Sequence, residues 1–168
     1  MIEKYEEMVK ECAREEENCL YNSTILILWL KALKRAKMFF IVAPIILGGF
    51  AGMKVLSTSD LDFMKYLMSA SSMIAGILPA IFSSLKIEAN ISQVDRYASG
   101  YKLLQGKFRR LKNISSKDNE FENEFKAVIK ELEELKLTTM TAPERFFVKA
   151  QSKIAKGHYD FAVDQNGK

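Results

Sequence analysis

The sequence has little histidine and cysteine, two of the residues from which catalytic and metal sites are often built. Among its 168 residues it has one histidine, His158, and two cysteines, Cys12 and Cys19. A metal site needs several such ligands close together. The sequence also has no glycine-rich phosphate loop and no evident pairing of a nucleophile with a base. We therefore predict that the protein is not an enzyme, that it uses no cofactor or metal, and that His158 is an ordinary surface residue.

The spacing of the two cysteines argues against a disulfide within the chain. If Cys12 and Cys19 lie on one helix, they are separated by about 10 Å, because each residue rises by about 1.5 Å. A disulfide holds its two Cα atoms closer together than that. We expect two buried thiols in a reducing compartment, and a bridge between two chains is the alternative.

The charge of the chain is mild in sum but uneven along its length. It has 25 Lys and Arg against 21 Asp and Glu, a net charge of +4, which gives little reason to expect a nucleic-acid partner. The mean hydropathy of −0.07 is typical of a soluble protein. Charged residues are nearly absent between Met38 and Leu85, however, and dense on either side. The average therefore conceals an apolar middle segment between charged flanks.

Two uncharged runs in this segment have the length and composition of membrane-spanning helices. The first is Met38–Met53, MFFIVAPIILGGFAGM, and it reaches about residue 59 if Lys37 and Lys54 extend toward the headgroups. The second is Tyr66–Leu85, YLMSASSMIAGILPAIFSSL, which has no charged residue. A spanning helix needs about 20 apolar residues. We predict membrane spans at about 38–59 and 66–85, and two buried helices of a soluble bundle are the alternative.

Basic residues near the two runs predict their orientation. They gather before the first run and after the second, whereas the connecting loop has two lysines offset by two aspartates. Because Lys and Arg near span ends stay in the cytoplasm, we predict a multi-pass protein with both termini cytoplasmic. The domains are then N-terminal amphipathic helices (1–37), a transmembrane hairpin (38–85) and a C-terminal helical region (86–168). The basic residues are Lys31, Lys34, Arg35, Lys37, Lys86, Arg96 and Lys102.

Small residues recur at every fourth position in both runs. In lipid, small residues let helix backbones approach closely, so we expect them to pack the spans within a hairpin or between chains of a homo-oligomer. The serines also allow a weakly polar pore lining, whereas the alternative is plain packing with each hydroxyl bonded to its own helix. Pro44 and Pro79 predict kinks. The packing or pore-lining candidates are Gly48, Gly52, Ser69, Ser72, Gly76, Ala80, Ser83 and Ser84.

The charged flanks have helical periodicity, which makes the chain all-α. Asn22 or Ser23 is predicted to cap a second N-terminal helix. After the second run, apolar residues continue at helical spacing to Leu111, so this helix could continue from the membrane. The acidic helix at 121–135 has a seam of apolar residues in near-heptad spacing. Its charge matches the basic end of the preceding helix, so the two are expected to pair antiparallel, with nucleic acid or lipid binding as the alternative for the basic run. Thr141 and Glu144 predict a capping box for a last helix, which Gly157 would end.

This organisation resembles the SLATT domain family of bacterial two-transmembrane proteins. The resemblance lies in the two runs, in IEANISQVDRYASGYKLLQGKFRRL after the second run, and in APERFFVKAQSKIAKGHYD near the end. It implies an anti-phage effector of the inner membrane that oligomerises and forms a pore or disrupts the bilayer, which aborts the infection. It also implies a separate upstream partner, a nucleotide-second-messenger synthase or sensor. The alternative function is a non-conducting, membrane-anchored helical scaffold that recruits cytosolic partners.

Overall fold

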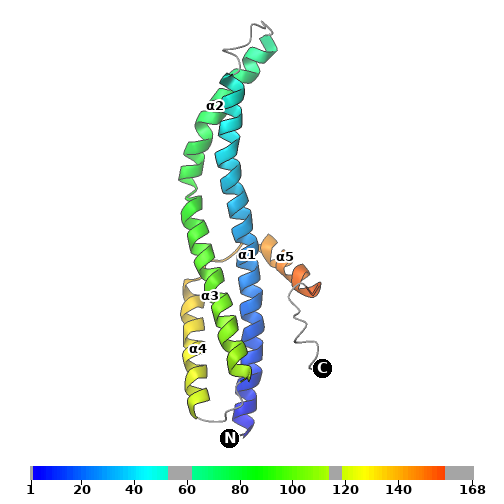
Figure 1. Ribbon diagram of the computed structural model, residues 1–168, viewed down its shortest axis with the longest axis vertical. Coiled ribbons are helices and arrows are strands. Elements are labelled where there is room, and N and C mark those ends of the chain that lie inside the picture. Colours follow the sequence, from blue (N-terminus) through cyan, green and yellow to red (C-terminus); the bar gives the residue numbers. More distant parts are fainter. Residues whose placement is uncertain (1, 53–61, 114–118, 158–168) are drawn as a thin grey trace. The chain divides into compact units, whose positions relative to one another are not determined.

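The computed structural model describes residues 2–52, 62–113 and 119–157 (Figure 1). In these ranges the chain forms five helices and no strand, which confirms the all-α prediction. The helices are α1 (Ile2–Gly52), α2 (Asp62–Ser84), α3 (Ile87–Asn113), α4 (Asn119–Thr138) and α5 (Glu144–Ala155).

The described helices divide between two compact units. Unit 1 contains Met1–Leu30 and Gln93–Lys168, and unit 2 contains Lys31–Ser92. The first part of α1 packs with most of α3, with α4 and with α5 in unit 1. The later part of α1 packs with α2 in unit 2.

The prediction of a second helix beginning near residue 22 is wrong, because α1 runs without a break from Ile2 to Gly52. Ser23 and Thr24 are buried, and their hydroxyls donate to the carbonyl of Leu20 at 2.9 and 2.8 Å. These residues therefore bond within a continuing helix and do not cap a new one. Pro44 also lies inside α1.

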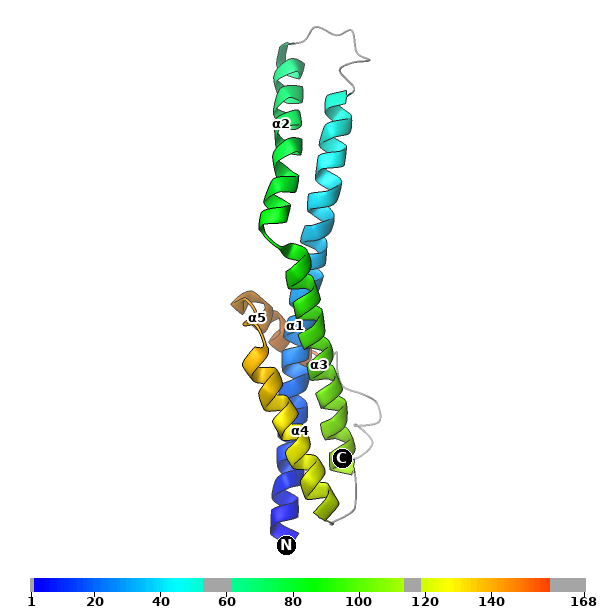
Figure 2. The same cartoon turned by 90° about the vertical axis from the view of Figure 1, so that its left-hand side faces the viewer.

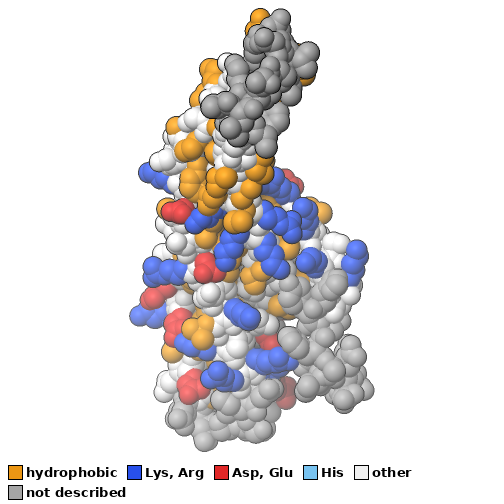
Figure 3. All heavy atoms as spheres, turned by 45° about the horizontal axis from the view of Figure 1, so that its top comes forward, with side chains coloured by type: hydrophobic (Ala, Val, Ile, Leu, Met, Phe, Trp, Pro, Cys, Tyr) orange, Lys and Arg blue, Asp and Glu red, His pale blue; other side chains and the backbone are white. Residues whose placement is uncertain are grey.

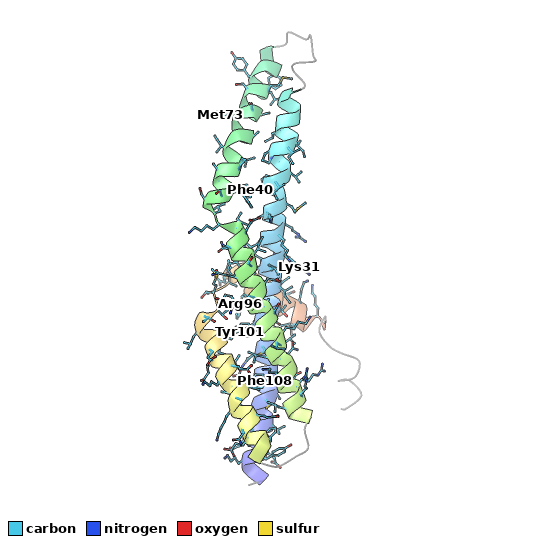
Figure 4. All side chains as sticks on the ribbon, turned by 60° about the vertical axis from the view of Figure 1, so that its left-hand side comes forward. Lys31, Phe40, Met73, Arg96, Tyr101 and Phe108 are labelled. Atoms are coloured by element: carbon cyan, nitrogen blue, oxygen red, sulfur yellow. The ribbon has the colours of Figure 1, made fainter. Side chains whose placement is uncertain are left out.

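The core of unit 1 follows the apolar periodicity of its helices. Phe108 and Leu132 are among its largest fully buried side chains, and Figure 4 shows Tyr101 and Phe108 on the side of α3 that faces its neighbours. Full burial of one large apolar side chain contributes about 1.5–3 kcal/mol. The predicted apolar seams of α3 and α4 are thereby confirmed. Their buried members are Val94, Tyr101, Leu104, Phe108, Leu111, Phe121, Val128 and Leu132.

The predicted antiparallel pairing of α3 with α4 is confirmed, and α1 shares in the charge matching. Lys107 of α3 contacts Glu131 of α4 at 2.7 Å. A Cβ atom on Gly100 would lie 3.2 Å from the Leu135 side chain, so glycine permits close approach of the two helices at this point. Lys112 of α3, however, bonds to Glu16 of α1 at 2.9 Å. Lysines at the basic end of α3 are thus ion-paired with both α4 and α1.

In unit 2, α2 runs alongside the later part of α1 (Figures 1 and 2). The rings of Phe40 and Phe82 lie 5.9 Å apart, and Phe40 lies between the two helices in Figure 4. The helix predicted to continue from the second run is interrupted, because α2 ends at Ser84 and Lys86 has a left-handed backbone with φ of 46°. The chain re-enters a helix at Ile87.

The capping box predicted for the last helix does not form. Pro143 occupies the N-cap position and makes no side-chain capping bond. The N–H of Phe146 donates instead to the carbonyl of Pro143 at 2.9 Å. The predicted stop is confirmed, because Gly157 has a φ of 70° and its N–H donates to the carbonyl of Ile154. Such a φ favours glycine, which has no Cβ atom to clash.

Candidate functional site

The segment Tyr66–Ser84 of α2 is the one stretch in the described ranges that is long and apolar enough to cross a membrane. Its mean hydropathy is 1.5, and 11% of it is buried in the folded chain. The first predicted span, 38–59, includes residues outside the described part, and its described portion to Gly52 does not meet the same criterion. The described residues therefore support one candidate span, where the sequence predicted two.

Large apolar side chains cover the outer surfaces of α1 and α2 in unit 2. On α1, Met38 is 60% exposed and Ile45 is 69% exposed. On α2, Tyr66 is 78% exposed and Met73 is 70% exposed. Figure 3 shows hydrophobic side chains gathered over these two helices. Soluble monomers rarely expose contiguous apolar patches beyond a few hundred Å², so this surface calls for an apolar environment or a partner.

The face of α2 that contacts α1 is not the one that the small residues occupy. Met68 and Ser71 are buried, and the same 3–4 spacing continues through the half-buried Ala75, Leu78 and Phe82. This inward face was not predicted from the sequence, although its spacing is the usual signal of a helix seam. The hairpin is thus packed by large and small residues on a different stripe.

The small residues singled out from the sequence lie on the exposed surface. Ser69, Ser72, Gly76, Ala80 and Ser83 are all exposed, as are Gly48, Pro79 and Ser84. A Cβ atom added to Gly48 or Gly76 would meet nothing within 4 Å. These residues therefore do not pack α2 against α1, and packing between chains stays a prediction. Pro44 is half-buried, and Gly52 ends α1.

The exposed small residues of α2 form one narrow stripe. At about 100° per residue, the five residues of this small-residue stripe fall within an arc of about 80°. The inward face borders the stripe on one side, and large apolar residues including Met73 and Ile77 border it on the other. These five residues are Ser69, Ser72, Gly76, Ala80 and Ser83.

The serine hydroxyls of α2 divide into two groups. Ser71 donates to the carbonyl of Leu67 at 2.8 Å, and Ser84 donates to that of Ala80 at 2.9 Å. The hydroxyls of Ser72 and Ser83 make no hydrogen bond within the described ranges. The stripe thus combines small volume with hydroxyls that are available to a neighbour.

Cationic side chains lie at one end of the apolar surface. Lys37 of α1 contacts Glu88 of α3 at 2.6 Å, which joins the two chain segments that leave this end. Four more basic side chains of unit 2 are exposed and lie close in sequence to the apolar runs: Lys31, Lys34, Arg35 and Lys86. This arrangement fits the predicted basic flanks of the two runs.

The prediction that both thiols are buried is confirmed in unit 1. Cys12 and Cys19 are both fully buried and unpaired with each other. Burial, and after it the carboxylate of Glu11, raises the pKa of the Cys12 thiol to about 11. Burial and the carboxylate of Glu15 raise the pKa of the Cys19 thiol to about 12. In the described ranges no group of His, Cys, Asp and Glu could hold a metal ion, and His158 lies outside them.

Comparison with known proteins finds no match among protein-family models, curated proteins or solved structures.

Proposed function

We propose that the protein is a two-span effector of the bacterial inner membrane, whose chains associate and permeabilise the bilayer. The observation that carries this proposal is the exposure of α2, since 11% of its apolar segment is buried in the chain. A soluble bundle would bury such a helix against its own neighbours. The proposed spans are about 38–59 and 66–85, with both termini in the cytoplasm.

The division of α2 into faces supports association between chains. Lipid supplies no hydrophobic drive for helix pairing, so close packing of small residues and interhelical hydrogen bonds must replace it. The small-residue stripe offers both, because Gly76 and Ala80 allow close approach and the hydroxyls of Ser72 and Ser83 are unbonded within the described residues. An unpaired hydroxyl in apolar surroundings costs about 1–3 kcal/mol. In an oligomer, these hydroxyls would face a neighbouring chain or water in a pore.

The biological setting of the proposal comes from the resemblance to the SLATT family. In that setting the trigger is a separate nucleotide-second-messenger synthase or sensor, and membrane damage stops the infected cell before phage matures. Before the trigger acts, the charged helices of unit 1 would keep the assembly from permeabilising the bilayer. These helices are packed and ion-paired among themselves.

Membrane potential in bacteria tests this proposal. Induced expression of the wild-type chain should depolarise the membrane, as read by a voltage-sensitive dye. Gly76→Leu or Ala80→Leu adds bulk to the small-residue stripe and should abolish the effect. Ile77→Leu conserves volume on the neighbouring apolar surface and should leave it intact. A membrane potential that stays intact after induction of the wild-type chain would contradict the proposal.

Purified protein in liposomes distinguishes the effector from the scaffold. An effector releases an entrapped dye, whereas a scaffold leaves the liposomes sealed. Carbonate extraction of cell membranes examines the span assignment separately, because a chain anchored by apolar helices stays in the pellet. Release of the wild-type chain into the supernatant would overturn the membrane assignment.

A further inference from the structure

An exposed cationic patch on α1 is continuous with the exposed apolar surface of the same helix. At about 100° per residue, six exposed side chains fall within an arc of about 100° on the side of α1 that is turned away from α2. We call this set the outer face of α1. It consists of Lys31, Lys34, Arg35, Met38, Val42 and Ile45.

The three cations of the outer face have no partner among the described residues. Lys31, Lys34 and Arg35 make no ion pair or hydrogen bond there. Lys37, one residue before the apolar run, lies outside this arc and is neutralised by Glu88 at 2.6 Å. Positive charge is therefore balanced on one side of α1 and unbalanced on the other.

We propose that the outer face of α1 binds an anionic phospholipid of the cytoplasmic leaflet. The phosphate lies on Lys31, Lys34 and Arg35, and an acyl chain runs along Met38, Val42 and Ile45. Lys34 and Met38 are one turn apart, about 6 Å along the axis, which is the scale on which a headgroup gives way to its acyl chains. The inference rests on the proposed membrane function, and it adds the lipid class that this membrane protein prefers.

The combination of charge and apolar surface favours a lipid over other anions. Clustered Lys and Arg beside a span attract anionic headgroups, and an arginine fork can bond two phosphate oxygens. A nucleic acid or an acidic protein would satisfy the cations. Neither would cover Met38 and Ile45, which are 60% and 69% exposed.

Quenching by brominated lipids measures this preference directly. The reporter is the full chain with Trp29→Phe, which removes its only tryptophan, and Ile46→Trp, which places one in the exposed apolar surface of α1 beside the outer face. Phosphatidylglycerol and phosphatidylcholine with brominated acyl chains are compared at equal mole fraction in phosphatidylcholine bilayers. We expect the reporter to favour phosphatidylglycerol about five-fold, and this preference should shrink at high salt.

Matched variants assign the preference to the outer face. Replacing Lys31, Lys34 and Arg35 together by Gln should bring the two lipids to parity, and Arg35→Gln alone should lower the preference. Lys37→Gln removes the same charge from the neutralised side and should retain it. Equal quenching of the reporter by both lipids, or a preference that survives the triple replacement, would overturn the inference.

The same measurement keeps this inference distinct from the proposed function. Quenching by brominated phosphatidylcholine shows that a given variant is inserted, so a loss of preference is not mistaken for a loss of folding. If neither lipid quenches the reporter, the chain is not in the bilayer, and the membrane assignment fails together with the inference.

Discussion

Cys19 is the residue whose chemistry is most strongly set by its surroundings in unit 1. Burial, and after it the carboxylate of Glu15, raises the pKa of its thiol to about 12, so very little of the thiol is the reactive thiolate near pH 8. We predict that neither Cys19 nor Cys12 reacts with a disulfide reagent at pH 8 in the native protein, and that both react in denaturant. A Leu103→Cys variant is the control, since Leu103 is 60% exposed. Rapid labelling of the native wild-type thiols would contradict this prediction.

The small residues of α2 show what residue-level patterns predict and what they omit. Their spacing of four residues correctly placed Ser72, Gly76 and Ala80 on one stripe, because helical periodicity is fixed by backbone geometry. It did not tell which stripe contacts α1. That depends on which large side chains, here Met68 and Phe82, fill the space between two particular helices.

At the scale of the helices, Glu122 ties the start of α1 to α4. It accepts hydrogen bonds from Lys126 and from Lys4 of α1, each at 2.7 Å, and these bonds lower the pKa of its carboxyl from 4.5 to about 2. A lowered pKa means that this stabilisation is present above pH 4.5 and is lost as the pH falls toward 2. We predict that the amide protection factors in the first turns of α1, which correct for the intrinsic pH dependence of exchange, fall over this pH range.

A variant with a neutral side chain at residue 122 distinguishes the loss of these Glu122 contacts from the general effect of acid on the protein. Glu122→Gln should show faster exchange in the first turns of α1 already at pH 7. Glu133→Gln is the matched control, because Glu133 is exposed on α4 and makes no ion pair within the described residues. Identical exchange in the wild type and in Glu122→Gln at pH 7 would refute the assigned role of Glu122.

The helices themselves were largely predictable, whereas some of their ends were not. The seams of α3 and α4 followed from apolar spacing, because burial of one face dominates their stability. Ser23 resembled a cap, yet it is buried inside α1, where packing outweighs local capping preference. The turn at Lys86 also escaped prediction, since a lysine with a φ of 46° gives no compositional signal of the kind that glycine gives.

For the molecule as a whole, the number of spans determines whether the two charged flanks lie on the same side of the membrane. Two spans place both flanks on one side, whereas a single span through α2 places them on opposite sides. Only α2 meets the length and hydropathy criterion within the described residues, while positive charge before the first run and after the second favours a common cytoplasmic side. The two topologies therefore differ in whether a reagent outside the cell can reach one of the flanks.

Labelling of intact cells with a membrane-impermeant maleimide decides between these topologies. Lys10→Cys in α1 and Ser92→Cys in α3 each place a thiol at an exposed position on one flank, and the native thiols stay silent because they are buried. With two spans, both variants are protected in intact cells and react after permeabilisation. With one span, one of the two reacts from outside and the other does not. We expect protection of both, and Asp60→Cys, which lies between the two proposed spans in sequence, should react in intact cells. Labelling of one flank alone from outside would rule out the first span, and labelling of either flank would overturn the cytoplasmic placement of both termini.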